Sequence, residues 1–143
     1  MTANYTTAVN EIQTLLKAAW DTTGFPLKYQ NVKGAADPPP STTTPWARST
    51  IQHTPGGQVS LSGGVGGAKR WQKNGFLTVQ IFVPAGEGLS EAYALAKTVE
   101  DAFAGVETPS AVWFRNPRIN EVGPDGEWYQ VNFVVDFTYD EIK

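Results

Sequence analysis

The segment Glu127–Tyr139, EWYQVNFVVDFTY, is the part of the chain that decides the fold. Its apolar side chains recur at every second position, and the positions between them are mostly polar. The apolar set is Tyr129, Val131, Phe133, Val135, Phe137 and Tyr139. A period of two is that of a β-strand with one apolar and one polar face. We therefore expect an antiparallel strand covered by helices on one side and open to solvent or to a partner on the other.

Four further strands are expected along the chain before this segment. A hairpin joins the last strand to Ala111–Asn120 through a turn at Gly123-Pro124-Asp125-Gly126. Alternating aliphatic side chains predict a strand that ends at Pro84. The three upstream strands are predicted at Leu27–Val32, Trp46–His53 and Trp71–Val83.

Two helices complete the predicted elements. Apolar residues spaced by three and four predict the first helix over Asn4–Trp20, and Pro26 prevents it from continuing. The second helix has Ser90 as its expected N-cap and Gly105 as its end. The order of elements predicts an α+β fold: a mixed or antiparallel sheet of about four to five strands, with two helices packed on one face and long Gly/Pro-rich loops.

Length and composition favour one folded domain over residues 1–143. The chain has no cysteine, so its stability must come from packing and from association of subunits. There is no apolar run of membrane-spanning length and no secretion signal, so we expect a protein that is made and kept in a cytosol, with no membrane partner.

Two long segments are expected to be loops. The first, Lys33–Pro45, contains Pro38-Pro39-Pro40 and cannot form a strand ladder. The second, Pro55–Arg70, has six glycines among sixteen residues, so we expect a mobile loop at about residues 54–70. This loop either becomes ordered on assembly or is merely tolerated, and the sequence leaves both interpretations open.

The sequence lacks the motifs of common catalytic sites. The phosphate-loop and dinucleotide patterns both fail around Gly64–Arg70, and His53 is the only histidine. No Gly-x-Ser-x-Gly elbow is present. We therefore expect no catalytic, cofactor-binding or metal-binding residues, no cofactor and no enzymatic activity.

Charge is unevenly distributed along the chain. No acidic residue lies between Asp37 and Glu87, while the same stretch contains Arg48, Lys69, Arg70 and Lys73. From Glu121 onward six acidic residues, which include Asp136, Asp140 and Glu141, stand against Lys143, a net charge of −5. One interpretation is chance unevenness on a solvated surface. The other is that a basic face of one subunit meets an acidic face of its neighbour.

Three of the five tryptophans, Trp46, Trp71 and Trp128, lie at predicted strand starts beside loops. Large amphipathic side chains at such places are more often interface anchors than stacking platforms for bases or sugars. For Trp20 and Trp113 we expect a place in the core. The candidate interface residues are therefore these three tryptophans together with the charged residues above.

The layout resembles that of the tail terminators of long-tailed bacteriophages, such as that of phage lambda. The resemblance rests on the first helix, the Pro-rich segment Asp37–Trp46, the Gly-rich loop Thr54–Gly67, the strand Phe76–Val83 with the helix Leu89–Phe103, and the closing strand Trp128–Tyr139. It implies a non-enzymatic virion protein, assembled in the host cytoplasm, that forms a hexameric ring on the head-proximal end of the tail tube.

The implied partners are further copies of the chain, the tail tube protein and the head-completion protein, with nucleic acid only passing through the ring. One alternative is another head-tail joining or tail-completion protein. A second is a module that binds small ligands or nucleic acid through the sheet and its tryptophans. An enzyme is a third alternative, and it lacks support from any motif.

Overall fold

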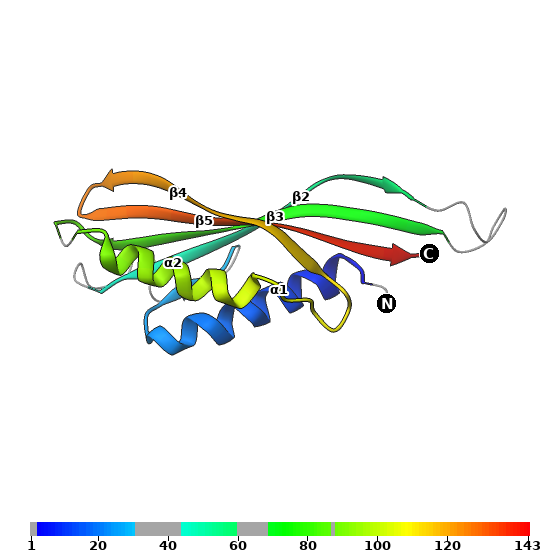
Figure 1. Cartoon of the computed structure of the whole chain (residues 1–143), viewed down its shortest axis with the longest axis horizontal. Helices are drawn as coiled ribbons and strands as arrows, with labels where there is room; N and C mark the ends of the chain where they lie inside the picture. Colours follow the sequence, from blue (N-terminus) through cyan, green and yellow to red (C-terminus); the bar gives the residue numbers. More distant parts are fainter. Residues whose placement is uncertain (1–2, 31–43, 60–68, 87) are drawn as a thin grey trace.

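The computed structural model describes residues 3–30, 44–59, 69–86 and 88–143, which form one five-stranded sheet with two helices on one face (Figure 1). The elements are α1 (Tyr5–Trp20), the 3-10 turn η1 (Asp21–Thr23), β1 (Leu27–Lys28), β2 (Trp46–Gln58), β3 (Arg70–Pro84), α2 (Ser90–Phe103), β4 (Trp113–Asp125) and β5 (Trp128–Ile142). The strand order is β1-β2-β3-β5-β4, with β1 parallel to β2 and the other pairs antiparallel. The predicted α+β fold is confirmed.

The ends of α1 follow from local chemistry. The side chain of Asn4 accepts a hydrogen bond from the Thr7 N–H at 2.8 Å, which caps the first turn. At the other end Gly24 adopts a left-handed φ of 74°, which an L side chain would resist. The indole Nε1 of Trp20 then donates to the Phe25 carbonyl at 2.9 Å, so the helix end is tied to the entry into β1.

The start of α2 differs from the prediction by one residue. Leu89 occupies the cap position without a side-chain hydrogen bond, and Ser90 is the first helical residue. Gly88, at a φ of 80°, turns the chain before the position where the serine was expected to cap it. Glu91 lies in the first turn, where the helix dipole favours a carboxylate.

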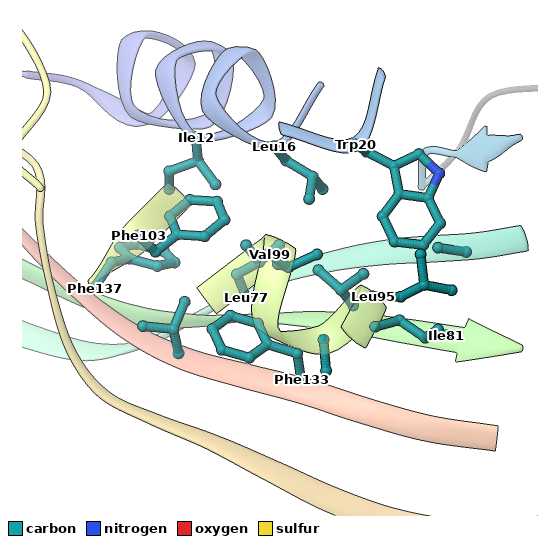
Figure 2. Packing of buried hydrophobic residues seen from close by; sticks show 14 of the residues in the cluster. Ile12, Leu16, Trp20, Leu77, Ile81, Leu95, Val99, Phe103, Phe133 and Phe137 are labelled. Carbon is teal, nitrogen blue, oxygen red and sulfur yellow. The ribbon is translucent and has the colours of Figure 1, made fainter. Parts of the chain in front are cut away.

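The core lies between the two helices and the sheet (Figure 2). It includes Ile12, Leu16 and Trp20 of α1, Leu95, Val99 and Phe103 of α2, and Leu77, Ile81, Phe133 and Phe137 of the sheet. Phe103 packs edge-on against Phe114 with ring centroids 4.9 Å apart. Burial of each large side chain contributes about 1.5–3 kcal/mol, which holds both helices on the same face.

The strand that decides the fold, β5, is buried on more than its apolar face. Its odd-numbered positions face the helices as predicted, and Phe133, Phe137 and Tyr139 are at most 1% exposed. On the other face Gln130 and Thr138 are also buried. The reason is that β5 lies between β3 and β4, so side chains of both neighbours cover it.

The strand β2 is longer than predicted. It continues through Thr54 to Gln58, and β3 begins at Arg70, so both ends of the expected loop over residues 54–70 belong to the sheet. A register shift between Thr54 and Gly57 accommodates the Pro-Gly-Gly stretch as a bulge. Residues 60–68, where the mobile loop was predicted, and most of the Pro-rich segment, residues 31–43, lie outside the described residues.

The turn between β4 and β5 also lies later than predicted. Gly123, Pro124 and Asp125 pair with β5, and the chain reverses at Gly126-Glu127. Gly123 adopts a φ of 103° at a second register shift, a conformation that favours glycine. The Gly-Pro-Asp-Gly pattern therefore marks a bulge followed by a two-residue turn.

Candidate assembly surfaces

The sheet presents one face that neither helix covers, which we call the helix-free face (Figure 1). The register of β2, β3, β5 and β4 places paired residues of neighbouring strands side by side on this face. Its members include Trp46, Arg48, Thr50 and Gln52 of β2, Phe76, Thr78, Gln80 and Phe82 of β3, Gln130, Asn132, Asp136 and Asp140 of β5, and Trp113, Arg115 and Arg118 of β4. A face of this composition is polar with aromatic corners, as the alternation in β5 predicts.

One corner of the helix-free face is an aromatic stack. Trp46 lies parallel to Phe82 with ring centroids 4.4 Å apart, and Trp128 meets Trp46 edge-on at 6.3 Å. Arg48 lies over Trp46 and Phe82 and donates to the Gln80 side chain at 2.6 Å. The indole Nε1 of Trp46 is buried and has no acceptor among the described residues. Two predicted anchors, Trp46 and Trp128, thus lie together.

The middle of the helix-free face is a network of charged side chains from β4 and β5. Asp136 accepts hydrogen bonds from Arg118 at 3.3 Å and from Asn116 at 3.2 Å. Arg115 bonds to the Thr138 hydroxyl and lies over the Trp113 ring. Trp113 is 46% exposed, so its predicted place in the core is wrong, because it pairs with Thr138 on the face opposite the helices.

The predicted basic and acidic segments meet within a single chain. β3 pairs with β5 so that Arg70 stands beside Asp140, and its guanidinium donates two hydrogen bonds to that carboxylate at 2.5 and 2.8 Å. Lys69 exchanges backbone hydrogen bonds with Lys143 at 2.6 and 2.9 Å. The Arg70 and Asp140 charges are therefore compensated without a neighbouring subunit.

The remaining predicted residues lie on the other face of the same end. Trp71 pairs with Glu141, and Lys143 lies over the Trp71 ring while its Nζ is 3.7 Å from the Glu141 carboxylate. Lys73 donates to the Tyr5 hydroxyl at 3.1 Å and lies over its ring. The candidate residues therefore divide between the two faces of the sheet instead of forming one patch.

The only histidine joins β2 to β5 beside the start of α1. His53 Nε2 is 2.8 Å from the Tyr139 hydroxyl, and the Tyr5 ring lies edge-on to the imidazole at 4.8 Å. Burial lowers the pKa of His53, and the nearby Lys73 charge lowers it further. Burial also raises the pKa of Tyr139, so the pair is neutral near pH 7. The His53–Tyr139 pair therefore joins β2 to β5 where α1 meets the sheet.

A carboxylate ties the loop before β4 to α1. Glu11 accepts hydrogen bonds from the Ser110 backbone N–H at 3.1 Å and from its hydroxyl at 2.6 Å. Partial burial acts to raise the pKa of Glu11, but the hydrogen bonds from Ser110 and Thr108 outweigh it and lower the pKa.

The sequence analysis missed a set of exposed apolar side chains at the end of the sheet that carries the β4–β5 turn, which we call the turn end. Leu89, Tyr93 and Val122 are 43%, 36% and 55% exposed. The Tyr93 hydroxyl donates to the Glu121 carboxylate, which joins α2 to the edge strand β4. An isolated valine among the polar residues around the turn was the signal that could have identified this surface.

Two kinds of site are missing from the described part of the chain. No group of three or more His, Cys, Asp or Glu side chains there could hold a metal ion. None of its helices has the length and apolar character needed to cross a membrane.

The comparisons with known proteins assign the chain to a family. A model of the phage tail terminator proteins matches residues 8–137, and the chain belongs to that family. It is accordingly a phage protein with a tail-related function, and the resemblance drawn from the sequence is confirmed at this level. No protein of curated function matches the sequence significantly.

Several solved structures share the fold, and two of them illustrate the likeness. One has a TM-score of 0.60 at 20% identity, and the match covers 89% of this chain and 94% of the other. The other is a chain of the virion of a native gene transfer agent particle, with a TM-score of 0.50 at 17% identity and coverage of 96% and 99%. At these identities the likeness shows the fold alone.

Proposed function

We propose that this chain is the tail terminator of its phage. Its subunits form a closed, hexameric ring on the head-proximal end of the tail tube. The ring stops polymerisation of the tube protein and then offers the surface to which the head-completion protein joins. Nucleic acid meets the protein only as it passes through the ring, and the protein belongs to the virion after assembly in the host cytoplasm.

The family match across residues 8–137 is the observation that carries this proposal. The geometry supports it because the helix-free face and both ends of the sheet present aromatic, apolar and charged groups to other molecules. Binding free energy is then the means of action, and catalysis has no part in it. Arg70 with Asp140, Arg118 with Asp136, His53 with Tyr139 and Glu11 with Ser110 form ion pairs or hydrogen bonds within the fold.

A deletion in the phage tests the proposal. Virions made without the chain should carry tails of uncontrolled length that do not join heads, and purified protein added to polymerising tube subunits should stop growth. Tails of normal length that join heads would refute the terminator function.

The site of attachment distinguishes the proposal from another head-tail joining role. Electron microscopy of purified protein mixed with isolated tails and with isolated heads should show rings on tail ends. Rings seated only on the portal of the head would favour a head-completion protein. A change of tryptophan fluorescence on addition of oligonucleotides, without any binding to tails, would favour a nucleic-acid-binding module.

A further inference from the structure

The two ends of the sheet carry opposite charge. At the end where β2, β3 and β5 run past the helices, which we call the arm end, four cations stand against two carboxylates, a side-chain net charge of +2. The cations are Lys69, Arg70, Lys73 and Lys143, and the carboxylates are Asp140 and Glu141. Within this set Arg70 pairs with Asp140 and Lys143 with Glu141.

The turn end is acidic. Glu91, Glu121, Asp125 and Glu127 are all exposed there, and neither residues 85–96 nor residues 119–131 include a lysine or arginine. The Tyr93 hydroxyl bonds to the Glu121 carboxylate and the Ala85 N–H bonds to the Glu127 carbonyl at 3.0 Å, so α2 and the loop before it are joined to the β4–β5 hairpin.

Exposed apolar side chains are concentrated at the same two ends. Of the seven large hydrophobic side chains exposed in the described part of the chain, Leu89, Tyr93 and Val122 lie at the turn end. Val59 and Ile142, each 51% exposed, lie at the arm end. Val59 donates its N–H to the Arg70 carbonyl at 2.8 Å, and Ile142 pairs with Arg70 from the other side. Each end thus combines exposed apolar groups with a net charge, which is positive at the arm end and negative at the turn end.

The ends lie at opposite extremes of the long axis (Figure 1). The fifteen residues of β5 separate them by about 50 Å at roughly 3.3 Å per residue. One subunit therefore cannot bring its own two ends together. A second copy can, because its turn end offers charge opposite to that of the arm end and apolar groups that can cover Val59 and Ile142.

We infer that the arm end of one subunit docks on the turn end of the next copy of the chain. This inference rests on the proposed ring and names the surfaces that close it. The contact is heterologous, because it joins two different surfaces. The arm end and the turn end of every subunit are both occupied only when the row of subunits closes into a ring. It narrows the expectation that a basic face meets an acidic face. Asp140 is already the partner of Arg70 within one subunit, so the acidic side of the contact is assigned to the turn end.

Cysteine cross-linking tests the contact, because the natural chain has no cysteine to interfere. Val59→Cys and Leu89→Cys, mixed in equal amounts and oxidised, should form a disulfide-linked heterodimer identified by mass. Its yield should exceed that of a matched mixture of Val59→Cys with Ala18→Cys, an exposed position on α1, by about tenfold. Raising salt from about 0.1 M to about 1 M shortens the Debye length from about 10 to about 3 Å and should reduce the difference.

Charge reversal supplies the second arm of the test. Adding Lys69→Glu and Lys143→Glu to the Val59→Cys chain should abolish the excess yield, and adding Asp125→Lys and Glu127→Lys to the Leu89→Cys partner should restore it. A folding defect would not be repaired by reversing charges on the other molecule. Equal yields for the Leu89 and Ala18 mixtures, or no restoration, would overturn the inference.

The two proposals fail separately. Uncontrolled tails in the deletion phage together with no excess cross-linking would leave the terminator function intact and remove this contact. Specific cross-linking together with normal tails would keep the head-to-tail contact and remove the terminator function.

Discussion

Gly56 is the position at which the arm end is most sensitive to a single methyl group. It lies in the bulge of β2, between Thr54 and Gly57. A Cβ atom there would be 2.2 Å from the Gln72 carbonyl oxygen and 3.3 Å from the Lys73 Cα. These are backbone atoms of the paired strand, so no rotation of a side chain can relieve the overlap. At Gly57 an added Cβ would meet nothing within 4 Å.

Gly56→Ala should therefore separate the end of β2 from β3, and Gly57→Ala is its matched control. Overpacking of this kind costs about 1–3 kcal/mol, and the entropy lost from the unfolded chain offsets about 0.4–1 kcal/mol of it. A net cost of about 1–2 kcal/mol raises the local opening equilibrium roughly 5- to 30-fold. Because the arm end lies beyond the helices, this opening need not unfold the core.

Hydrogen–deuterium exchange measured by mass spectrometry gives the readout. In Gly56→Ala the amides of residues 54–59 and 70–74 should exchange faster by that factor, while those of residues 77–83 keep their protection. Gly57→Ala should exchange no faster than the natural chain. Equal exchange in both variants, or faster exchange throughout the sheet, would refute the reasoning. The same variant should also reduce cross-linking between positions 59 and 89.

Three further perturbations test the interior. His53→Gln should remove a pH dependence of the free energy of unfolding. Because the pKa of His53 is lowered in the folded state, the stability that the neutral imidazole contributes is present above pH 6.5 and is lost as the pH falls toward the folded-state pKa. The free energy of unfolding in urea should therefore differ more between pH 7.5 and pH 5 for the natural chain than for the variant. Glu11→Gln should cost about 1 kcal/mol at pH 7 through weaker bonds to Ser110. Because the pKa of Glu11 is lowered from 4.5, the difference in free energy of unfolding between the variant and the natural chain should vanish as the pH falls through the folded-state pKa. Equal stability of the two chains at pH 7 would contradict this prediction. Phe103→Ala should cost about 3–5 kcal/mol in chemical unfolding, whereas Val122→Ala at the exposed turn end should stay within about 0.5 kcal/mol.

The elements that could be predicted are those whose own side chains repeat with the right period. The alternation of β5 and the three-and-four spacing of α1 report on a buried face, and burial is what fixes both elements. The end of β2 carries no such signal, because Pro55, Gly56 and Gly57 have low strand propensity. Pairing with Gln72 and Trp71 of β3 overrides that propensity, and it depends on a strand that comes later in the chain.

The charge pattern shows why the candidate site was harder to predict than the fold. Arg70 and Asp140 are seventy residues apart, and only the register of β3 against β5 brings them into contact. Sequence can count the charges of a segment but cannot say whether its counter-charge lies in the same subunit. The face on which Trp113 lies was likewise hard to predict. It depends on the register in which the edge strand β4 pairs with β5 and on the bulge in β4.

The edges of the sheet provide an independent reason to expect contacts through its ends. An unpaired edge strand invites another chain to add a strand, yet both edges here are obstructed. β4 contains Pro117 and Pro124 and two register shifts, which remove donors and bend the ladder. On β2 the Gln30 side chain accepts from the Ile51 N–H at 2.9 Å, and Pro55 offers no donor further along. Simple strand addition is thus disfavoured along these parts of both edges, which is consistent with contacts through the ends of the sheet.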